Sequence, residues 1–279
     1  LPEAGILDFG TDPFDLKFDP LKGQMLSWIV VLLPYVEQQA LFDDFDLNRS
    51  ALDQPHEPQE FQPPSLTCPS DQSGSRMYSD PTFTNGKRFA KGNYAAFAGP
   101  YHLEDQFKFP GAISGKGNKL SKLRDGLSNT LMLSEVRTRE HEQDQRGAWA
   151  LPWNGSTLLA FDMHPTNPRS PAYVGSPRSL GVTQLPNTGA AEFSAGSNPV
   201  SGNLDILYNC PEMNVAQLEG MPCGDYQRYR WLSSAPRSRH PQGVNVAYAD
   251  GHTKFYPNDV NEFVMAYEIS IDDGHVIDF

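Results

Sequence analysis

The sequence predicts an α+β fold in which a mainly antiparallel sheet packs on an N-terminal helix and long loops join the elements. Residues 24–45 place apolar side chains at three- and four-residue steps, the periodicity of a helix with one buried face. Residues 130–136 and 243–257 alternate apolar and polar side chains, as half-buried strands do. The 24 prolines and 23 glycines among 279 residues indicate many turns and loops.

The chain begins with an irregular arm, residues 1–23, in which Asp and Pro favour turns over a regular ladder. A single globular domain over residues 24–279 is expected to follow. Its first element is the helix over 24–45, kinked at Pro34, because proline lacks the N–H that a helix interior needs. Residues 49–67 are rich in Pro and Gln and read as a linker.

Short strands then alternate with turns. A strand is expected over 130–136, after a turn at Asp125-Gly126. Val244, Val246 and Tyr248 share one face of a later strand, and Asp250-Gly251 turns the chain into its hairpin partner at 252–256. Further expected elements are strands at 92–100, 109–114 and 147–153, a short helix at 257–267, and a loop-rich insertion around 162–203.

Charge and motif content exclude several function classes. The net charge of −12 disfavours nucleic acid or an anionic membrane surface as a partner. The longest apolar stretch, residues 28–36, is too short to span a bilayer. The chain starts with Leu1 rather than Met, which is typical of a processed or trimmed chain. Because no G-x-S-x-G, H-E-x-x-H, phosphate-loop or C-x-x-C motif occurs, we expect a non-enzymatic protein.

Three cysteines stand at positions 68, 210 and 223. Cys210 and Cys223 enclose a loop short enough for a local disulfide, and two free thiols are the alternative. The two cysteines with one histidine are too few ligands for a structural zinc site. Cys68 is left over, either as a buried thiol or as one whose partner precedes this chain.

Two polar residues stand out beside the expected strands. His240 precedes Pro241, which favours an extended backbone, and nine extended residues span about 30 Å, so His240 and Asp250 do not form a dyad. They belong to separate polar clusters, or they serve only strand entry and turn. Glu135 closes the strand on its apolar face and needs a partner, for which Arg237, Arg239 or His240 are candidates; a solvent-facing carboxylate is the alternative.

Four stretches occur in order within residues 25–256: SWIVVLLPYVEQQALFDDF, TCPSD, RDGLSNTLMLSEV and SAPRSRHPQGVNVAYADGHTKF. Together they resemble the pattern of a bacterial prepilin-like family of unknown function that carries a C-terminal H-x9-D-G motif. The motif consists here of His240, Asp250 and Gly251. The preceding Ser-Arg, which completes the sequence SRH, makes the match specific. The resemblance also favours the disulfide between Cys210 and Cys223.

Members of that family carry a prepilin processing site and a long apolar helix ahead of a soluble domain similar to type II secretion pseudopilins. The resemblance therefore implies a pilin-like head that acts as a structural subunit of an extracellular, cell-surface or periplasmic pilus, pseudopilus or filament. Its expected partner is another copy of itself, contacted through the arm at 1–23. The alternative for this arm is that it folds back on its own sheet. The alternative is an extracellular module that binds a glycan or solute, with stacking by Trp28, Trp149, Trp153 and Trp231.

Calcium is the one cofactor that the resemblance brings into consideration, since pseudopilins often hold Ca²⁺ in a C-terminal loop, although none is required. Candidate ligands are Asp205, Asp225 and Asp250, with residues 271–278 as a second acidic cluster. Neither group has the spacing of a continuous calcium loop. Solvated surface carboxylates are the alternative.

Overall fold

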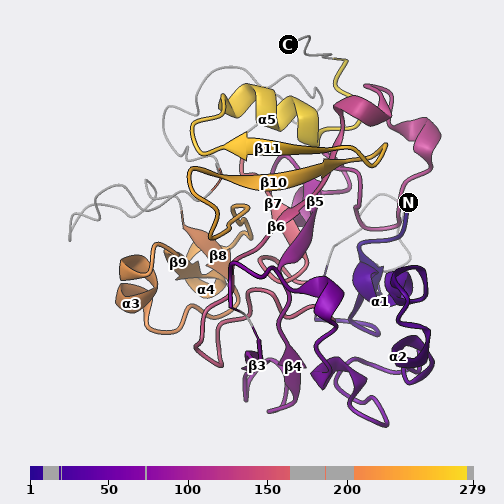
Figure 1. Cartoon of the computed structure of the whole chain (residues 1–279), viewed down its shortest axis with the longest axis vertical. Helices are drawn as coiled ribbons and strands as arrows, with labels where there is room; N and C mark the ends of the chain where they lie inside the picture. The colour runs from indigo at the N-terminus through magenta and orange to yellow at the C-terminus, as the bar shows by residue number, and fades with distance from the viewer. Residues whose placement is uncertain (9–18, 20, 73, 164–185, 187–203, 275–279) are drawn as a thin grey trace.

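The computed structural model describes residues 1–8, 19, 21–72, 74–163, 186 and 204–274. This part of the chain is mixed α+β, with several small sheets and few helices (Figure 1). Its helices are α1 (Trp28–Leu32), α2 (Gln39–Asp43), α3 (Met213–Leu218), α4 (Tyr226–Tyr229) and α5 (Glu262–Ile269). Its strands are β1 (Gly5–Ile6), β2 (Leu26–Ser27), β3 (Met77–Ser79), β4 (Arg88–Ala90), β5 (Tyr94–Gly99), β6 (Leu131–Glu135), β7 (Leu158–Ala160), β8 (Asp205–Leu207), β9 (Cys223–Asp225), β10 (Gly243–Tyr248) and β11 (Thr253–Pro257).

A five-stranded sheet in the order β11-β10-β6-β5-β7 forms the centre of the fold. Neighbouring strands are antiparallel except β5 and β7, which run parallel. The predicted hairpin is confirmed, because β10 and β11 pair with Val244 opposite Tyr256. Gly251 in its turn has φ +91°, a conformation that glycine adopts without strain. The predicted strands at 92–100 and 130–136 and the short C-terminal helix are also confirmed, as β5, β6 and α5.

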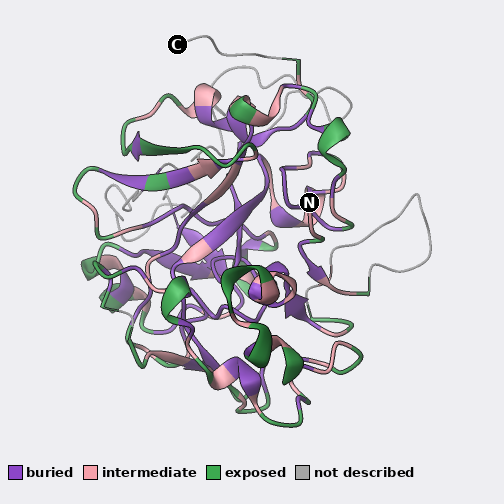
Figure 2. Cartoon of the chain, turned by 45° about the vertical axis from the view of Figure 1, so that its right-hand side comes forward, coloured by how far each residue is buried: buried purple, intermediate pink, exposed green. Residues whose placement is uncertain are grey.

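The two faces of this sheet belong to different apolar cores. Along β5, Ala96 and Ala98 face one core, while Ala95 and Phe97 face the other, as the two-residue period of a strand requires. α5 packs on the second face, where its buried side chains meet the apolar residues of β10. Figure 2 shows buried residues running through the middle of the molecule and exposed residues on the outer turns.

The N-terminal helix prediction is wrong as a continuous element. α1 ends at Leu32, a 3-10 turn containing Pro34 follows (Leu33–Val36), and α2 begins only at Gln39. The break occurs because Pro34 offers no N–H for a helix ladder and Glu37 takes a left-handed conformation with φ +61°. Among the described residues, no helix is long and apolar enough to span a bilayer.

Two predicted strands are also wrong. Residues 109–114 are irregular with bends, and residues 147–153 contribute only an isolated bridge between Ala148 and Lys91. Pro110 and Pro152 interrupt these segments, and proline cannot donate to a strand ladder. The predicted insertion at 162–203 lies almost wholly outside the described residues.

The first residues of the chain pack on the chain itself. β1 pairs with β2, so that Ile6 lies opposite Leu26. Ala4 is fully buried and donates its N–H to the carbonyl of Gly115 at 3.2 Å. Residues 1–8 therefore follow the alternative in which the arm folds back on its own chain, and the contact with a neighbouring copy stays a prediction. Most of the arm's remainder lies outside the described part.

β8 and β9 form a small parallel sheet that the Cys210–Cys223 disulfide fastens. The two Cα atoms are 5.6 Å apart, and α3 lies between the two cysteines in the sequence. The predicted disulfide is confirmed. Cys68 is the remaining cysteine, a free and buried thiol.

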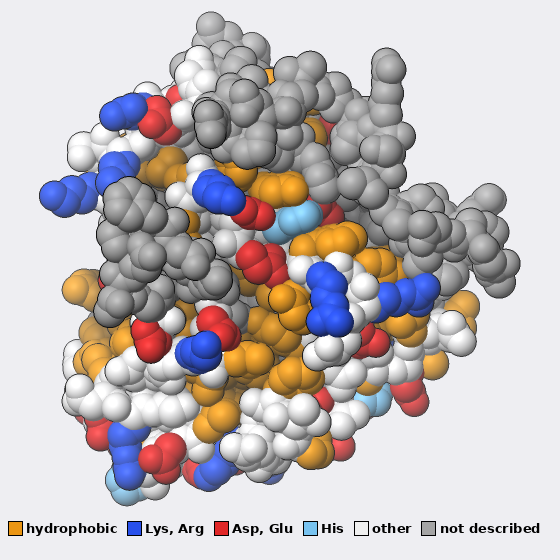
Figure 3. All heavy atoms as spheres, turned by 180° about the vertical axis from the view of Figure 1, so that it is seen from behind, with side chains coloured by type: hydrophobic (Ala, Val, Ile, Leu, Met, Phe, Trp, Pro, Cys, Tyr) orange, Lys and Arg blue, Asp and Glu red, His pale blue; other side chains and the backbone are white. Residues whose placement is uncertain are grey.

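The face opposite to Figure 1 mixes apolar and charged side chains. Figure 3 shows hydrophobic side chains across the centre of this face, with Lys or Arg and Asp or Glu side chains around them. On the part of this face that the described residues form, both signs of charge are interspersed (Figure 3).

Candidate functional site

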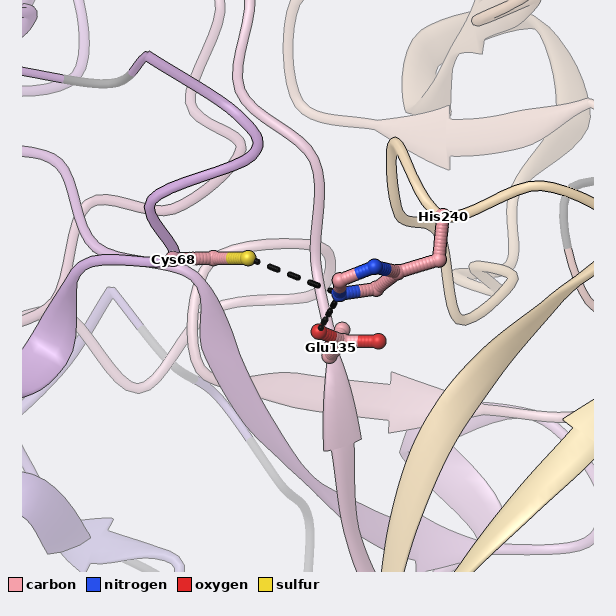
Figure 4. A group of neighbouring side chains, drawn as sticks. All are labelled: Cys68, Glu135 and His240. Carbon is pink, nitrogen blue, oxygen red and sulfur yellow. Dashed lines mark hydrogen bonds and ion pairs between the residues drawn. The ribbon is translucent and has the colours of Figure 1, made fainter.

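Three chemically active side chains from distant segments converge at one point (Figure 4). Sγ of Cys68 lies 3.6 Å from Nε2 of His240, and the same nitrogen lies 3.0 Å from Oε1 of Glu135. Cys68 and Glu135 are buried at 8% and 4% exposure, whereas the His240 side chain is 28% exposed. The site therefore has a buried floor and one solvent-facing side.

The central sheet positions two of the three residues. Glu135 is the last residue of β6, and its Oε2 accepts the N–H of Asn245 in the neighbouring strand β10 at 2.6 Å. His240 lies in the turn just before β10, where its N–H donates to Oγ of Ser238 at 3.0 Å. The antiparallel pairing of β6 with β10 thus brings residues 135 and 240 together.

A buried polar chain holds the third residue. The N–H of Cys68 donates to Oδ1 of Asn93 at 2.9 Å. Nδ2 of Asn93 donates in turn to Asp71 at 2.7 Å and to the carbonyl of Val136 at 2.9 Å. Since Val136 directly follows Glu135, the loop that carries Cys68 is fixed relative to the end of β6.

The contacts differ from those of a thiol, imidazole and carboxylate relay. A relay uses both ring nitrogens, one toward the nucleophile and the other toward the carboxylate. Here Cys68 and Glu135 both approach Nε2 of His240. The arrangement suits three donors directed at one point more than it suits stepwise proton transfer.

Sequence reasoning found two members of the cluster and missed the third. Among the three partners expected for Glu135, His240 pairs with its side chain, and Arg237 donates only a backbone N–H to its carbonyl at 2.8 Å. Arg239 pairs instead with Asp71 at 3.4 Å. The signal for Cys68 was its TCPSD stretch, one of the four that carry the family resemblance.

The two halves of the H-x9-D-G motif occupy separate places. Asp250 accepts the N–H of His252 at 3.0 Å and contacts its ring nitrogen at 2.6 Å, so it caps the hairpin turn. Hydrogen bonds from His252, first from its backbone N–H and then from its side chain, lower the pKa of Asp250. The other predicted turn, at Asp125-Gly126, fastens the C-terminal segment through the side chain of Asp125, which accepts the N–H groups of Asp273 and Gly274.

The carboxylates considered for calcium serve other contacts. Asp205 is fully buried and pairs with Arg146 at 2.7 Å and with Arg237 at 2.8 Å. Asp225 accepts the N–H of Cys210 at 2.7 Å. Over the described residues, the one group of three or more potential metal ligands is Cys68, Glu135 and His240, so Asp205, Asp225 and Asp250 do not form a shared site there.

A pocket of about 350 Å³ follows the same strand end beyond Glu135. Four arginines line it, Arg76, Arg137, Arg139 and Arg239, together with the acidic Glu140 and Glu219. Arg139 pairs with Glu219, whereas Nε of Arg137 is buried and has no hydrogen-bond partner among the described residues. Burial, followed by the charge of Arg239, lowers the pKa of Arg137 to about 10. Sequence reasoning did not predict this pocket.

Comparison with protein families identifies the chain at family level. The model of the family SBP_bac_10, described as "Protein of unknown function (DUF1559)", matches residues 1–262. The chain therefore belongs to this family. The searches of curated proteins and of solved structures found no match.

Proposed function

We propose that this member of the DUF1559 family is a non-enzymatic structural subunit, with a pilin-like head, of a pilus-like, pseudopilus-like or other filamentous assembly. The observation that carries the proposal is the edge strand β11. Within the described part of the chain, β11 pairs with β10 on one side only. Such an edge can accept a strand from a second copy of the chain.

The side chains of β11 support this use of the edge. Thr253, Lys254 and Phe255 are exposed, and Phe255 presents a large apolar side chain at 50% exposure. Isolated proteins usually protect sheet edges with charge, proline or short strands. Lys254 and Pro257 limit pairing at this edge, so the proposed contact is a short strand addition in which Phe255 is the apolar anchor.

The disulfide supports a place outside the cytoplasm. Disulfides such as Cys210–Cys223 persist in oxidising compartments and are rare where thiols are kept reduced. We accordingly place the proposed assembly at the cell surface, outside the cell or in the periplasm.

A substitution that places a charged side chain on β11 tests this proposed contact. Phe255→Lys should reduce the mass of assemblies measured by light scattering, because a buried cation at the contact would be desolvated. Tyr35→Lys is the matched control, since Tyr35 is 82% exposed and lies in a 3-10 turn away from the sheet. Unchanged assembly in the Phe255 variant, with unchanged circular dichroism, would contradict the role of β11.

A second candidate function is the binding of an anionic solute, and the arginine pocket is the observation that favours it. Guanidinium groups bind carboxylates and phosphates through paired hydrogen bonds. Arg137 brings a buried donor to this pocket. The glycan form of this alternative is less favoured, because Trp28, Trp149 and Trp153 are buried at 4%, 1% and 0% exposure and cannot stack on a sugar.

Citrate and inorganic phosphate are suitable probes for the pocket. Arg137→Gln should weaken binding measured by calorimetry about 10–100-fold, since a hydrogen bond to a charged group contributes about 1.5–3 kcal/mol. Arg124→Gln is the control, because Arg124 pairs with Asp272 at an exposed position outside the pocket. Equal binding by wild type and the Arg137 variant would exclude this pocket as the anion site.

A further inference from the structure

We propose that Cys68, Glu135 and His240 form a binding site for a divalent transition-metal ion of the zinc type. The inference is independent of the proposed assembly, since it rests on the donor atoms alone. These atoms are one sulfur, one imidazole nitrogen and one carboxylate oxygen, all within 4.8 Å of one another.

The distances from Nε2 of His240 to the other two donors are close to those of tetrahedral coordination. Zinc bonds of about 2.0–2.3 Å at the tetrahedral angle place two donors roughly 3.3–3.6 Å apart. Sγ of Cys68 lies 3.6 Å from Nε2 of His240, and Oε1 of Glu135 lies 3.0 Å from it. The thiol and carboxylate donors lie within 4.8 Å of each other, so seating an ion requires that pair to approach by up to roughly 1.5 Å to reach tetrahedral spacing.

A metal ion can also interact with all three donor atoms at once, whereas a single proton on His240 cannot. Nε2 of His240 either carries one hydrogen or offers one lone pair, so it cannot donate fully to Cys68 and Glu135 together. An ion at the meeting point accepts electron pairs from all three donors at once. The buried carboxylate of Glu135 and the buried thiol of Cys68 would then gain a common partner.

Neighbouring groups hold each of the three residues in place, and for Glu135 they also orient the carboxylate, as outer-shell partners do in natural metal sites. The second oxygen of Glu135 accepts a backbone N–H from Asn245. The backbone of Cys68 is held by Asn93, and that of His240 by Ser238. Because these supports come from different strands and turns, an ion would fasten the Cys68 loop, β6 and the entry of β10 to one another.

The donor set decides the class of ion. Ca²⁺ and Mg²⁺ prefer all-oxygen sites, whereas thiolate and imidazole favour Zn²⁺, Co²⁺ and related ions. Three protein ligands leave a fourth position, which on the exposed side of His240 would hold water or another small ligand. The site thus resembles an open zinc site more than a closed structural one.

Cobalt titration of the whole, disulfide-intact chain tests the proposal. After chelator treatment, one equivalent of Co²⁺ should produce a thiolate-to-cobalt charge-transfer band, and Zn²⁺ should displace it and raise the melting temperature. Cys210 and Cys223 are joined in the disulfide, so only Cys68 can supply this thiolate. Cys68→Ser should abolish the band.

His240→Gln and Glu135→Gln should each weaken Zn²⁺ binding by more than the roughly 10–100-fold typical of a lost outer-shell partner. His252→Gln is the matched control, because His252 pairs with Asp250 away from the cluster and should bind Zn²⁺ like wild type. Wild-type protein that shows no charge-transfer band, or a Cys68→Ser variant that keeps it, would overturn the proposal. If a variant fails to fold, the wild-type band and protection of the Cys68 thiol from alkylation by Zn²⁺ still decide it.

Discussion

Asp205→Ala should lower the free energy of unfolding by about 3–5 kcal/mol, because it removes the shared partner of two buried arginines. Oδ2 of Asp205 accepts Nη1 of Arg146 at 2.7 Å and Nε of Arg237 at 2.8 Å. Both arginine side chains are only 2% exposed, so water cannot replace the lost carboxylate. Urea denaturation followed by circular dichroism measures the change in midpoint.

A surface ion pair provides the matched control for this substitution. Asp272 pairs with Arg124 at 2.9 Å, but their side chains are 50% and 72% exposed. Asp272→Ala should therefore cost about 0–1 kcal/mol. If Asp205→Ala is as mild as the control, the buried network does not hold β8 against the body of the domain.

Loss of the disulfide should cost about 3 kcal/mol, the value that loop-closure entropy gives for a loop of this length. Cys210 and Cys223 are 13 positions apart and are buried with Leu207 and Ala216 in a small apolar cluster. A Cys210→Ser/Cys223→Ser double variant should unfold at a lower urea concentration than wild type.

Reduction of the wild-type protein should reproduce the effect of the double variant, since both remove the same cross-link. Reducing agent added to the double variant is the control, because that variant has no disulfide left to reduce. Reduced and oxidised wild type with the same denaturation midpoint would show that the bridge does not contribute to stability.

The sequence predicted correctly those elements whose formation depends on neighbouring residues in the chain. The β10–β11 hairpin follows from alternating Val244, Val246 and Tyr248 and from the Asp250-Gly251 turn. The prediction of one N-terminal helix failed because it assumed that apolar periodicity continues the helix through Pro34 and Glu37. The backbone leaves the helical conformation at these residues. Apolar periodicity specifies which side chains are buried, and Trp28, Ile29 and Val30 are buried, but it does not guarantee one continuous helix.

The candidate site could be predicted only in part, because one of its residues comes from a segment distant in the sequence. Glu135 lies at the end of an amphipathic strand, which shows that its carboxylate needs a partner, and His240 was among the named candidates. Cys68 joins them across 172 positions of sequence from His240, through a loop held by Asn93. No local pattern reports such a contact, because it depends on how the loop packs against the sheet.

Asp205, in contrast to Cys68, was proposed as a ligand from the sequence but does not belong to the candidate site. Its residue type and the resemblance to pseudopilins suggested a calcium ligand, yet its oxygens accept hydrogen bonds from Arg146, Arg237 and the N–H of Ala235. Composition does not distinguish a carboxylate that binds a metal from one that neutralises buried arginines. Only the three-dimensional neighbours decide between the two.

The most direct test of the structural role is imaging of native material that contains this chain, by electron microscopy of intact cell surfaces and isolated assemblies. We expect ordered assemblies in which successive heads meet at β11, with Phe255 within the contact. Dispersed single copies, or an ordered assembly in which β11 faces solvent, would contradict it.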